Sequence, residues 1–196
     1  LGFEISADVL CGKTIVVYEE IKADGKSIAE HKDPEAKEQS IYFPEIGTKA
    51  LDENSKTQEG EAKEKQKIID QITYKNLLPD ETYVLKGVLM DKETGKAIEQ
   101  NGKAVTAETS FTATAAQGSV DLTFVYDSSV LEGKTTVAYE KLYHNEKDVA
   151  RHEDINDAGQ TVQIPKIQTT ATSVETGDQV GTIGKEVQIT DVVSYK

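Results

Sequence analysis

The stretch DVARHEDINDAGQTVQIPKIQTTAT, residues 148–172, decides how the chain is organised. It contains a His, a Gln eight positions later and a Thr nine positions after that. The same residue types recur at the same spacings in SIAEHKDPEAKEQSIYFPEIGTKAL, residues 27–51. The first set is His31, Gln39 and Thr48, and the second, each 121 positions later, is His152, Gln160 and Thr169. A constant offset of this kind indicates an internal repeat.

The repeat predicts the domain organisation. Residues 1–75 align with residues 122–196 without a gap, and 25 of these 75 positions are identical. We therefore expect three parts: the C-terminal part of a preceding repeat (1–45), one whole unit of 121 residues (46–166) and the N-terminal part of a following repeat (167–196). On this interpretation the chain is a window cut from a tandem array, in which similar modules stack on their neighbours.

Apolar residues alternate with polar ones along most of the chain, which is typical of strands with one buried face. Gly, Asn and Asp separate the alternating segments, as in Asp24-Gly25. The predicted strands are 1–9, 13–22, 26–31, 39–43, 46–51, 68–75, 82–90, 97–99, 104–114, 119–126, 134–143, 147–152, 160–164, 167–172 and 186–196. Residues 52–67 are charged and are predicted to form a solvated loop, with a short helix at 61–67 as the alternative. Many short strands predict an all-β fold, a β-sandwich.

Composition excludes several classes of function. The net charge is −13, which repels phosphate, so we expect neither a nucleic-acid nor an anionic-membrane partner. No apolar run approaches the roughly 20 residues that a membrane-spanning helix needs. The one cysteine, Cys11, cannot form an internal disulfide, and its counterpart in the repeat is Glu132. Phosphate-loop, paired-Cys zinc and GxSxG motifs are absent, so no cofactor or metal is expected.

Several polar residues are predicted to point toward the core. Residues i and i+2 of a strand share a face, and each of these polar residues shares its face with apolar ones. The set in the whole unit is Thr48, Asp70, His152 and Gln160, and its counterparts at the same offset are Thr169, Asp191, His31 and Gln39. Glu140, at the end of VAYE and repeated as Glu19 in VVYE, is a further candidate member. Each residue alone is more often structural. Their joint recurrence favours a functional cluster, because burying unpaired polar groups costs several kcal/mol.

A dry cluster of a hydroxyl, a carboxamide and proton-transfer groups can form an ester. A His or a carboxylate can activate the Thr hydroxyl, and the packed interior holds the reactants together. The product joins the Thr oxygen to the Gln side-chain carbonyl and releases ammonia. Each site would react once, so the chain is not expected to be an enzyme with turnover.

The sequence resembles the T-Q ester-bond domains, also called VaFE repeats. The resemblance rests on GKTTVAYE (133–140), HEDINDAGQ (152–160), PKIQT (165–169) and ITDVVSYK (189–196), with GKTIVVYE, HKDPEAKEQ and PEIGT earlier in the chain. Such domains occur in tandem in the stalks of Gram-positive, cell-wall-anchored adhesins. The resemblance implies an Ig-like sandwich whose first and last strands are joined by an autocatalytic Thr–Gln ester.

Carried over to this chain, the resemblance implies that Thr48 is the nucleophile and Gln160 the acceptor. His152, Asp70 and Glu140 would transfer protons and polarise the amide, and the carboxylate roles stay open. Gln39 would belong with a Thr upstream of residue 1, and Thr169 with a Gln downstream of residue 196. The implied partners are neighbouring repeats and an unknown host ligand, and the implied location is the cell surface.

Two alternatives to this function stay open. The first is an Ig-like adhesin module cross-linked by a Lys–Asn/Asp isopeptide bond. The second is a ligand-binding module without a cross-link, in which the polar cluster is a hydrogen-bond network. Calcium is a weaker possibility, because DINDAGQ (154–160) has part of the oxygen spacing of a calcium loop but its counterpart DPEAKEQ (33–39) does not keep it.

Overall fold

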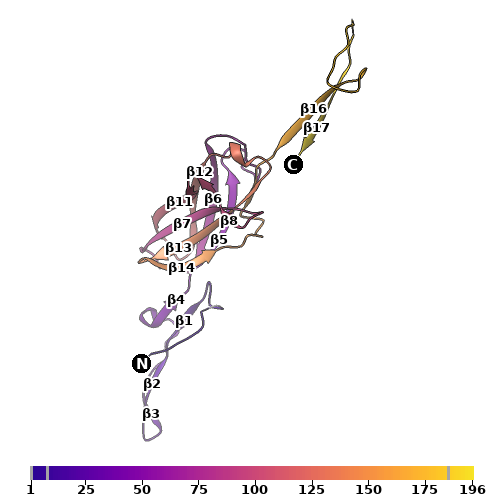
Figure 1. Ribbon diagram of the computed structural model, residues 1–196. Coiled ribbons are helices and arrows are strands. Elements are labelled where there is room, and N and C mark those ends of the chain that lie inside the picture. Colours follow the sequence, from indigo (N-terminus) through magenta and orange to yellow (C-terminus); the bar gives the residue numbers. More distant parts are fainter. Residues whose placement is uncertain (1, 8, 185) are drawn as a thin grey trace.

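The computed structural model describes residues 2–7, 9–184 and 186–196 (Figure 1). Nearly all of its regular structure is β-strand, with two single-turn 3-10 helices, η1 (Lys37–Gln39) and η2 (Ser129–Leu131). No helix in the described ranges is long and apolar enough to cross a membrane. The predicted all-β class is therefore confirmed.

Residues 45–164 form a sandwich of two antiparallel sheets. The first sheet has the order β12-β6-β5 and the second β11-β7-β13-β14, with β15 on β13 and β8 on β7. The first sheet consists of β5 (Glu45–Asp52), β6 (Gln66–Lys75) and β12 (Gly118–Tyr126). The second consists of β7 (Thr82–Asp91), β8 (Lys96–Ala97), β11 (Thr106–Thr112), β13 (Thr135–His144), β14 (Lys147–His152) and β15 (Thr161–Gln163), and β9 (Glu99–Gln100) pairs with β10 (Lys103–Ala104) beside it.

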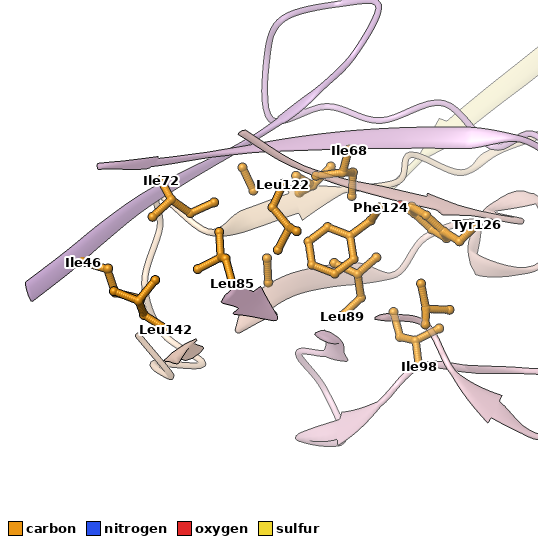
Figure 2. Packing of buried hydrophobic residues seen from close by; sticks show 14 of the residues in the cluster. Ile46, Ile68, Ile72, Leu85, Leu89, Ile98, Leu122, Phe124, Tyr126 and Leu142 are labelled. Carbon is orange, nitrogen blue, oxygen red and sulfur yellow. The ribbon is translucent and has the colours of Figure 1, made fainter. Parts of the chain in front are cut away.

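The core lies between the sheets and follows from strand alternation. Figure 2 shows side chains from both sheets turned toward one another, including Ile68 and Ile72 of β6 and Leu85 and Leu89 of β7, all fully buried. The sheets approach closely at Gly87 of β7. A Cβ there would lie 2.5 Å from the ring of Phe124, so glycine is required for the packing.

Two smaller parts extend from opposite ends of the sandwich (Figure 1). The N-terminal segment, described from residue 2 to residue 44 except residue 8, contains two separate hairpin-like pairs, β1 with β4 and β2 with β3. Their bounds are β1 (Thr14–Val16), β2 (Glu19–Ala23), β3 (Lys26–His31) and β4 (Ser40–Tyr42). The C-terminal hairpin, residues 165–196, pairs β16 (Ile167–Ser173) with β17 (Ile189–Tyr195). None of the core residues of the sandwich comes from either part.

Strand register repeats at the offset of 121 residues. Glu19 pairs with His31 as Glu140 pairs with His152, and each ladder shifts register two residues later. The β16–β17 ladder likewise pairs Ala171 with Asp191, where β5–β6 pairs Ala50 with Asp70. The full register of these pairs therefore follows the alignment. The domain boundaries at residues 45 and 166 stay predictions.

Two predicted strands near the N-terminus are wrong. Residues 2–7 and 9 are not in a strand, and residues 1 and 8 lie outside the described ranges. The strand predicted at 13–22 is split into β1 and β2 by Val17 and Tyr18. Alternation marks a face that a partner strand or sheet could cover, and this part of the chain pairs only along short ladders.

Residues 53–65 form a loop as predicted, without the alternative helix. The loop is not simply solvated. The Ser128 hydroxyl donates to the carbonyl oxygen of Glu61 at 2.5 Å and also lies 3.1 Å from that of Lys63. The amide of Gly60 donates to the carbonyl of Gln163 at 2.7 Å, so the loop lies against β15.

Candidate functional site

The first two site residues come from the edge of the three-stranded sheet. Thr48 lies on β5, between the buried Ile46 and Ala50, and its Oγ1 is buried. Asp70 lies on the neighbouring strand β6 and is fully buried. The register pairs Ala50 with Asp70 and Thr48 with Ile72, so Thr48 and Asp70 are diagonal neighbours on the inner face. Alternation alone predicted this placement.

The other two buried members come from the facing sheet. Glu140 lies on β13 and Gln160 directly precedes β15, and both are fully buried. The Gln160 carboxamide nitrogen donates a hydrogen bond to Glu140 Oε2. The Glu140 carboxyl also interacts with the side chains of Thr48 and Asp70. The structure therefore brings Thr48, Asp70, Glu140 and Gln160 into one cluster between the sheets.

Five buried oxygen atoms in this cluster have no well-formed hydrogen bond among the described residues. They are Thr48 Oγ1, both carboxylate oxygens of Asp70, Glu140 Oε1 and Gln160 Oε1. A buried polar atom without a partner costs about 1–3 kcal/mol, and native proteins contain only a few. A purely structural hydrogen-bond network would satisfy its members, and these atoms are not satisfied.

Burial shifts the acid–base properties of both carboxyl groups. It raises the pKa of Asp70 to about 6, although the interaction with the neighbouring Glu140 carboxyl and the charge of His152 act in the opposite direction. Burial, together with the negative charge of Asp70, raises the pKa of Glu140 far above its ordinary range. At neutral pH the two buried carboxyl groups therefore share one proton, because ionising both of them so close together in a dry interior is costly.

His152 lies at the edge of the cluster. It pairs with Glu140 across the β13–β14 ladder and is partly exposed, rather than pointing fully into the core as predicted. Its Nε2 lies 2.7 Å from Asp157 Oδ2. Hydrogen bonds from the Gly159 amide and from His152 lower the pKa of Asp157, although partial burial opposes them. Asp157 therefore stays ionised and orients the imidazole toward one tautomer.

Asp157 is the site residue that the sequence argument missed. Its counterpart at the offset of 121 is Ala36, so comparison of the two copies could not reveal it. The available signal was its position in the turn between His152 and Gln160. There its Oδ1 also accepts a hydrogen bond from the Gly159 amide at 2.6 Å.

The backbone around Gln160 is held by both sheets. The Ala50 amide of β5 donates to the Gly159 carbonyl at 2.9 Å, and the Ala138 amide of β13 donates to the Gln160 carbonyl at 3.0 Å. A Cβ at Gly159 would lie 3.3 Å from the Thr48 carbonyl oxygen. This close approach places the segment that carries Gln160 directly against the strand that carries Thr48.

The predicted counterparts outside the sandwich are only partly assembled. The Gln39 carboxamide donates to Glu19 Oε2, as Gln160 does to Glu140, but both residues are partly exposed. His31 is exposed. Thr169 and Asp191 occupy the C-terminal hairpin, where both are exposed. In the described ranges, no group of three or more His, Cys, Asp or Glu side chains is arranged to hold a metal ion.

Comparison with known families agrees with this geometry. A model of the T-Q ester bond containing domain matches residues 1–43, 44–164 and 165–196. The chain belongs to the T-Q ester bond domain family. The recognition made from sequence motifs is therefore confirmed, and the site residues lie within the stretches that this T-Q ester bond domain model matches.

A solved adhesin structure shares the fold of this T-Q ester bond protein. A bacterial adhesin from Mobiluncus mulieris, described as containing intramolecular disulfide, isopeptide and ester bond cross-links, matches in two crystal forms. In each form the identity is 15%, the TM-score 0.51, and the match covers 79% of this chain and 76% of the adhesin. A β-galactosidase from Bacteroides fragilis matches with 14% identity and a TM-score of 0.44, covering 66% of this chain and 19% of that one. None of the curated proteins compared matches in sequence.

Proposed function

We propose that the sandwich is a structural module of a bacterial surface adhesin, closed by an intramolecular ester between Thr48 and Gln160. The observation that carries the proposal is the buried Gln160–Glu140 hydrogen bond, which lies against Thr48 and Asp70. Membership of the T-Q ester bond domain family and the fold shared with the Mobiluncus mulieris adhesin support it.

The reaction needs no external reagent. The Thr48 oxygen attacks the side-chain carbonyl carbon of Gln160, and the Thr48 O–H and Gln160 C–N bonds break as the C–O ester bond forms. The nitrogen leaves as ammonia, carrying the proton that the hydroxyl lost. Packing between the sheets supplies proximity, which in intramolecular reactions replaces high reactant concentrations. The product is one ester and one ammonia for each site.

The two carboxyl groups divide the proton transfers. Asp70, ionised at neutral pH, takes the hydroxyl proton of its diagonal neighbour Thr48. Glu140, protonated and hydrogen-bonded to the leaving nitrogen, donates its proton there. Direct transfer between the two neighbouring carboxyl groups then returns the proton from Asp70 to Glu140. His152, held by Asp157, exchanges protons with solvent at the edge of the cluster.

The position of the ester suits a module under tension. The N-terminal segment and the C-terminal hairpin extend from opposite ends of the sandwich (Figure 1). The chain enters the sandwich on β5, which carries Thr48, and leaves it on β15, directly after Gln160. A pulling force would therefore pass from residue 48 to residue 160 through covalent bonds, without unzipping the strands between them. This supports a stalk role at the cell surface, with neighbouring repeats as partners.

The geometry disfavours the isopeptide alternative. Among the described residues, no lysine or asparagine is buried. Lys134 and Asp91 form a pair at 2.7 Å, but the Lys134 side chain is 42% exposed. Although burial acts in the opposite direction, hydrogen bonds from Lys134 and from backbone amides lower the pKa of Asp91. An ionised pair whose lysine is open to solvent is a salt bridge rather than the reactants of an amide bond.

Intact mass spectrometry of the purified chain tests the proposal. We expect the mass to lie one ammonia below the sequence mass, and alkaline hydroxylamine to cleave the cross-link. The Thr48→Ala variant should keep the full mass, while Thr48→Ser, which retains a hydroxyl, should again lose ammonia. A wild-type mass equal to the sequence mass would contradict the proposal and favour a hydrogen-bonded module without a cross-link. A loss that survives Thr48→Ala and resists hydroxylamine would favour the isopeptide.

A further inference from the structure

Gln58, in the loop 53–65, contacts the backbone on both sides of Gln160. The two N–H groups of its carboxamide are shared among three carbonyl oxygens, those of Ala158, of Gly159 at 3.1 Å and of Thr161 at 2.9 Å. The Gln58 carbonyl in turn accepts a hydrogen bond from the Gln163 amide at 2.8 Å. One side chain, distant in sequence, thus spans the segment that presents the electrophile.

The internal alignment singles out the same residue. Between positions 51 and 67, the chain is identical to its counterpart 121 residues later at only two positions, Gln58 with Gln179 and Gly60 with Gly181. Both residues of the loop contact residues 158–163, the segment that carries Gln160. Gly60 donates its amide to the Gln163 carbonyl, and a Cβ there would lie 3.3 Å from Val162. The other residues between positions 51 and 67 all differ from their counterparts 121 residues later.

The contact has a direct geometric consequence. The Gln160 side chain must hold its carbonyl carbon against Thr48, and a misplacement of about 1 Å can slow a positioned reaction by about 100-fold. Ala50 and Ala138 fix one peptide group each on either side of the Gln160 Cα. Gln58 holds the carbonyls of Ala158, Gly159 and Thr161 with one amide group, which restrains the turn that carries Gln160.

We propose that Gln58 is a positioning residue for ester formation, which holds the backbone around Gln160 so that its carboxamide faces Thr48. This inference rests on the proposed function. Gln58 takes no part in proton transfer, because its side chain contacts backbone carbonyls rather than the reacting atoms. It acts on the rate through geometry, and it leaves the acid–base groups of the cluster unchanged.

The test is the rate of ammonia loss during cell-free synthesis of the full chain, followed by acid quenching and intact mass. We expect Gln58→Ala to slow the reaction by about 10- to 100-fold. Gln58→Glu, of the same length but without N–H donors, should slow it at least as much. The pH profile of the rate should keep its wild-type shape in both variants, since the titrating groups are untouched.

Two controls separate positioning from general loosening. Ser128→Ala removes a different anchor of the same loop, at Glu61 and Lys63, without touching residues 158–161. Gln179→Ala makes the same substitution in the C-terminal hairpin. Both should react at the wild-type rate. If Gln58→Ala reacts at the wild-type rate, or if Ser128→Ala slows the reaction equally, the positioning role is wrong. A wild type that never loses ammonia would instead contradict the proposed function itself.

Discussion

Gln160 and Gln39 make the same hydrogen bond in different surroundings. Each donates from its carboxamide to a glutamate 20 residues earlier, Glu140 or Glu19, and each glutamate pairs with a histidine across a bulged ladder. Gln160 and Glu140 are fully buried beneath a facing sheet, whereas Gln39 and Glu19 are partly exposed. The Gln–Glu pair is thus built by local strand pairing. The facing sheet adds Thr48, Asp70 and the burial that shifts the carboxyl pKa values.

The largest expected effect is on the free energy of unfolding, which should depend on Thr48 but not on its counterpart Thr169. The Thr48–Gln160 ester would close a loop of roughly 112 residues, and by analogy with a disulfide this stabilises the fold by about 4–5 kcal/mol. We expect Thr48→Ala to lower the free energy of unfolding by that amount in urea titrations followed by circular dichroism. Thr169→Ala, at the equivalent register position of the exposed hairpin, should leave it unchanged. Equal losses in the two variants would contradict the assignment.

Substitution of Glu140 and of its counterpart Glu19 should have almost as different effects on ester formation and stability. Glu140→Ala removes the acid beside the leaving nitrogen, and we expect intact mass spectrometry to show no ammonia loss. In a Thr48→Ala background, where no cross-link forms, the same change should cost about 1–3 kcal/mol, because it leaves the buried Gln160 amide unpaired. Glu19→Ala, at the partly exposed pair, should change neither the mass difference nor the urea midpoint. A normal ammonia loss in Glu140→Ala would exclude it as the acid.

His152 contacts an aspartate at position 157, whereas its counterpart His31 has an alanine at the equivalent position 36. Asp157→Ala gives the sandwich the residue found at the equivalent position 36 and frees His152. Since positioned acid–base groups contribute about 100-fold or more, we expect ester formation to slow by about 100-fold in the quenched time course. Ala36→Asp should have no effect on the rate. An unchanged rate in Asp157→Ala would place the His152–Asp157 pair outside the mechanism.

The smallest effect is a pH dependence from Asp70. Burial raises its pKa to about 6, so the ionised base is lost as the pH falls through that value. We expect the rate to rise about tenfold between pH 5 and pH 7. The raised pKa also predicts that the Thr48→Ala protein loses stability as the pH rises from about 4 to about 6, because the unfolded chain releases this proton first. Asp70→Asn in that background should flatten the slope, and an unchanged slope would assign it to other groups.

Sequence patterns predicted much of this arrangement, for physical reasons that also explain the failures. Alternation placed Thr48 and Asp70 on inner faces, because a strand has only two faces to choose from. The offset of 121 residues located Thr48 and Gln160 but not Asp157, whose counterpart is Ala36. The contacts of Gln58 bring together residues about 100 positions apart, and its loop is too polar to show periodicity. The division of roles between Asp70 and Glu140 depends on burial, which no local pattern encodes.

Peptide mapping of the full wild-type chain tests the central claim most directly, because it compares the two glutamines in one sample. After protease digestion, tandem mass spectrometry should find the Thr48 peptide joined to the Gln160 peptide. Gln39 should remain an unmodified glutamine, and the intact chain should lack one ammonia. An intact chain of full sequence mass, or a cross-link at Gln39 with Gln160 unmodified, would contradict the account.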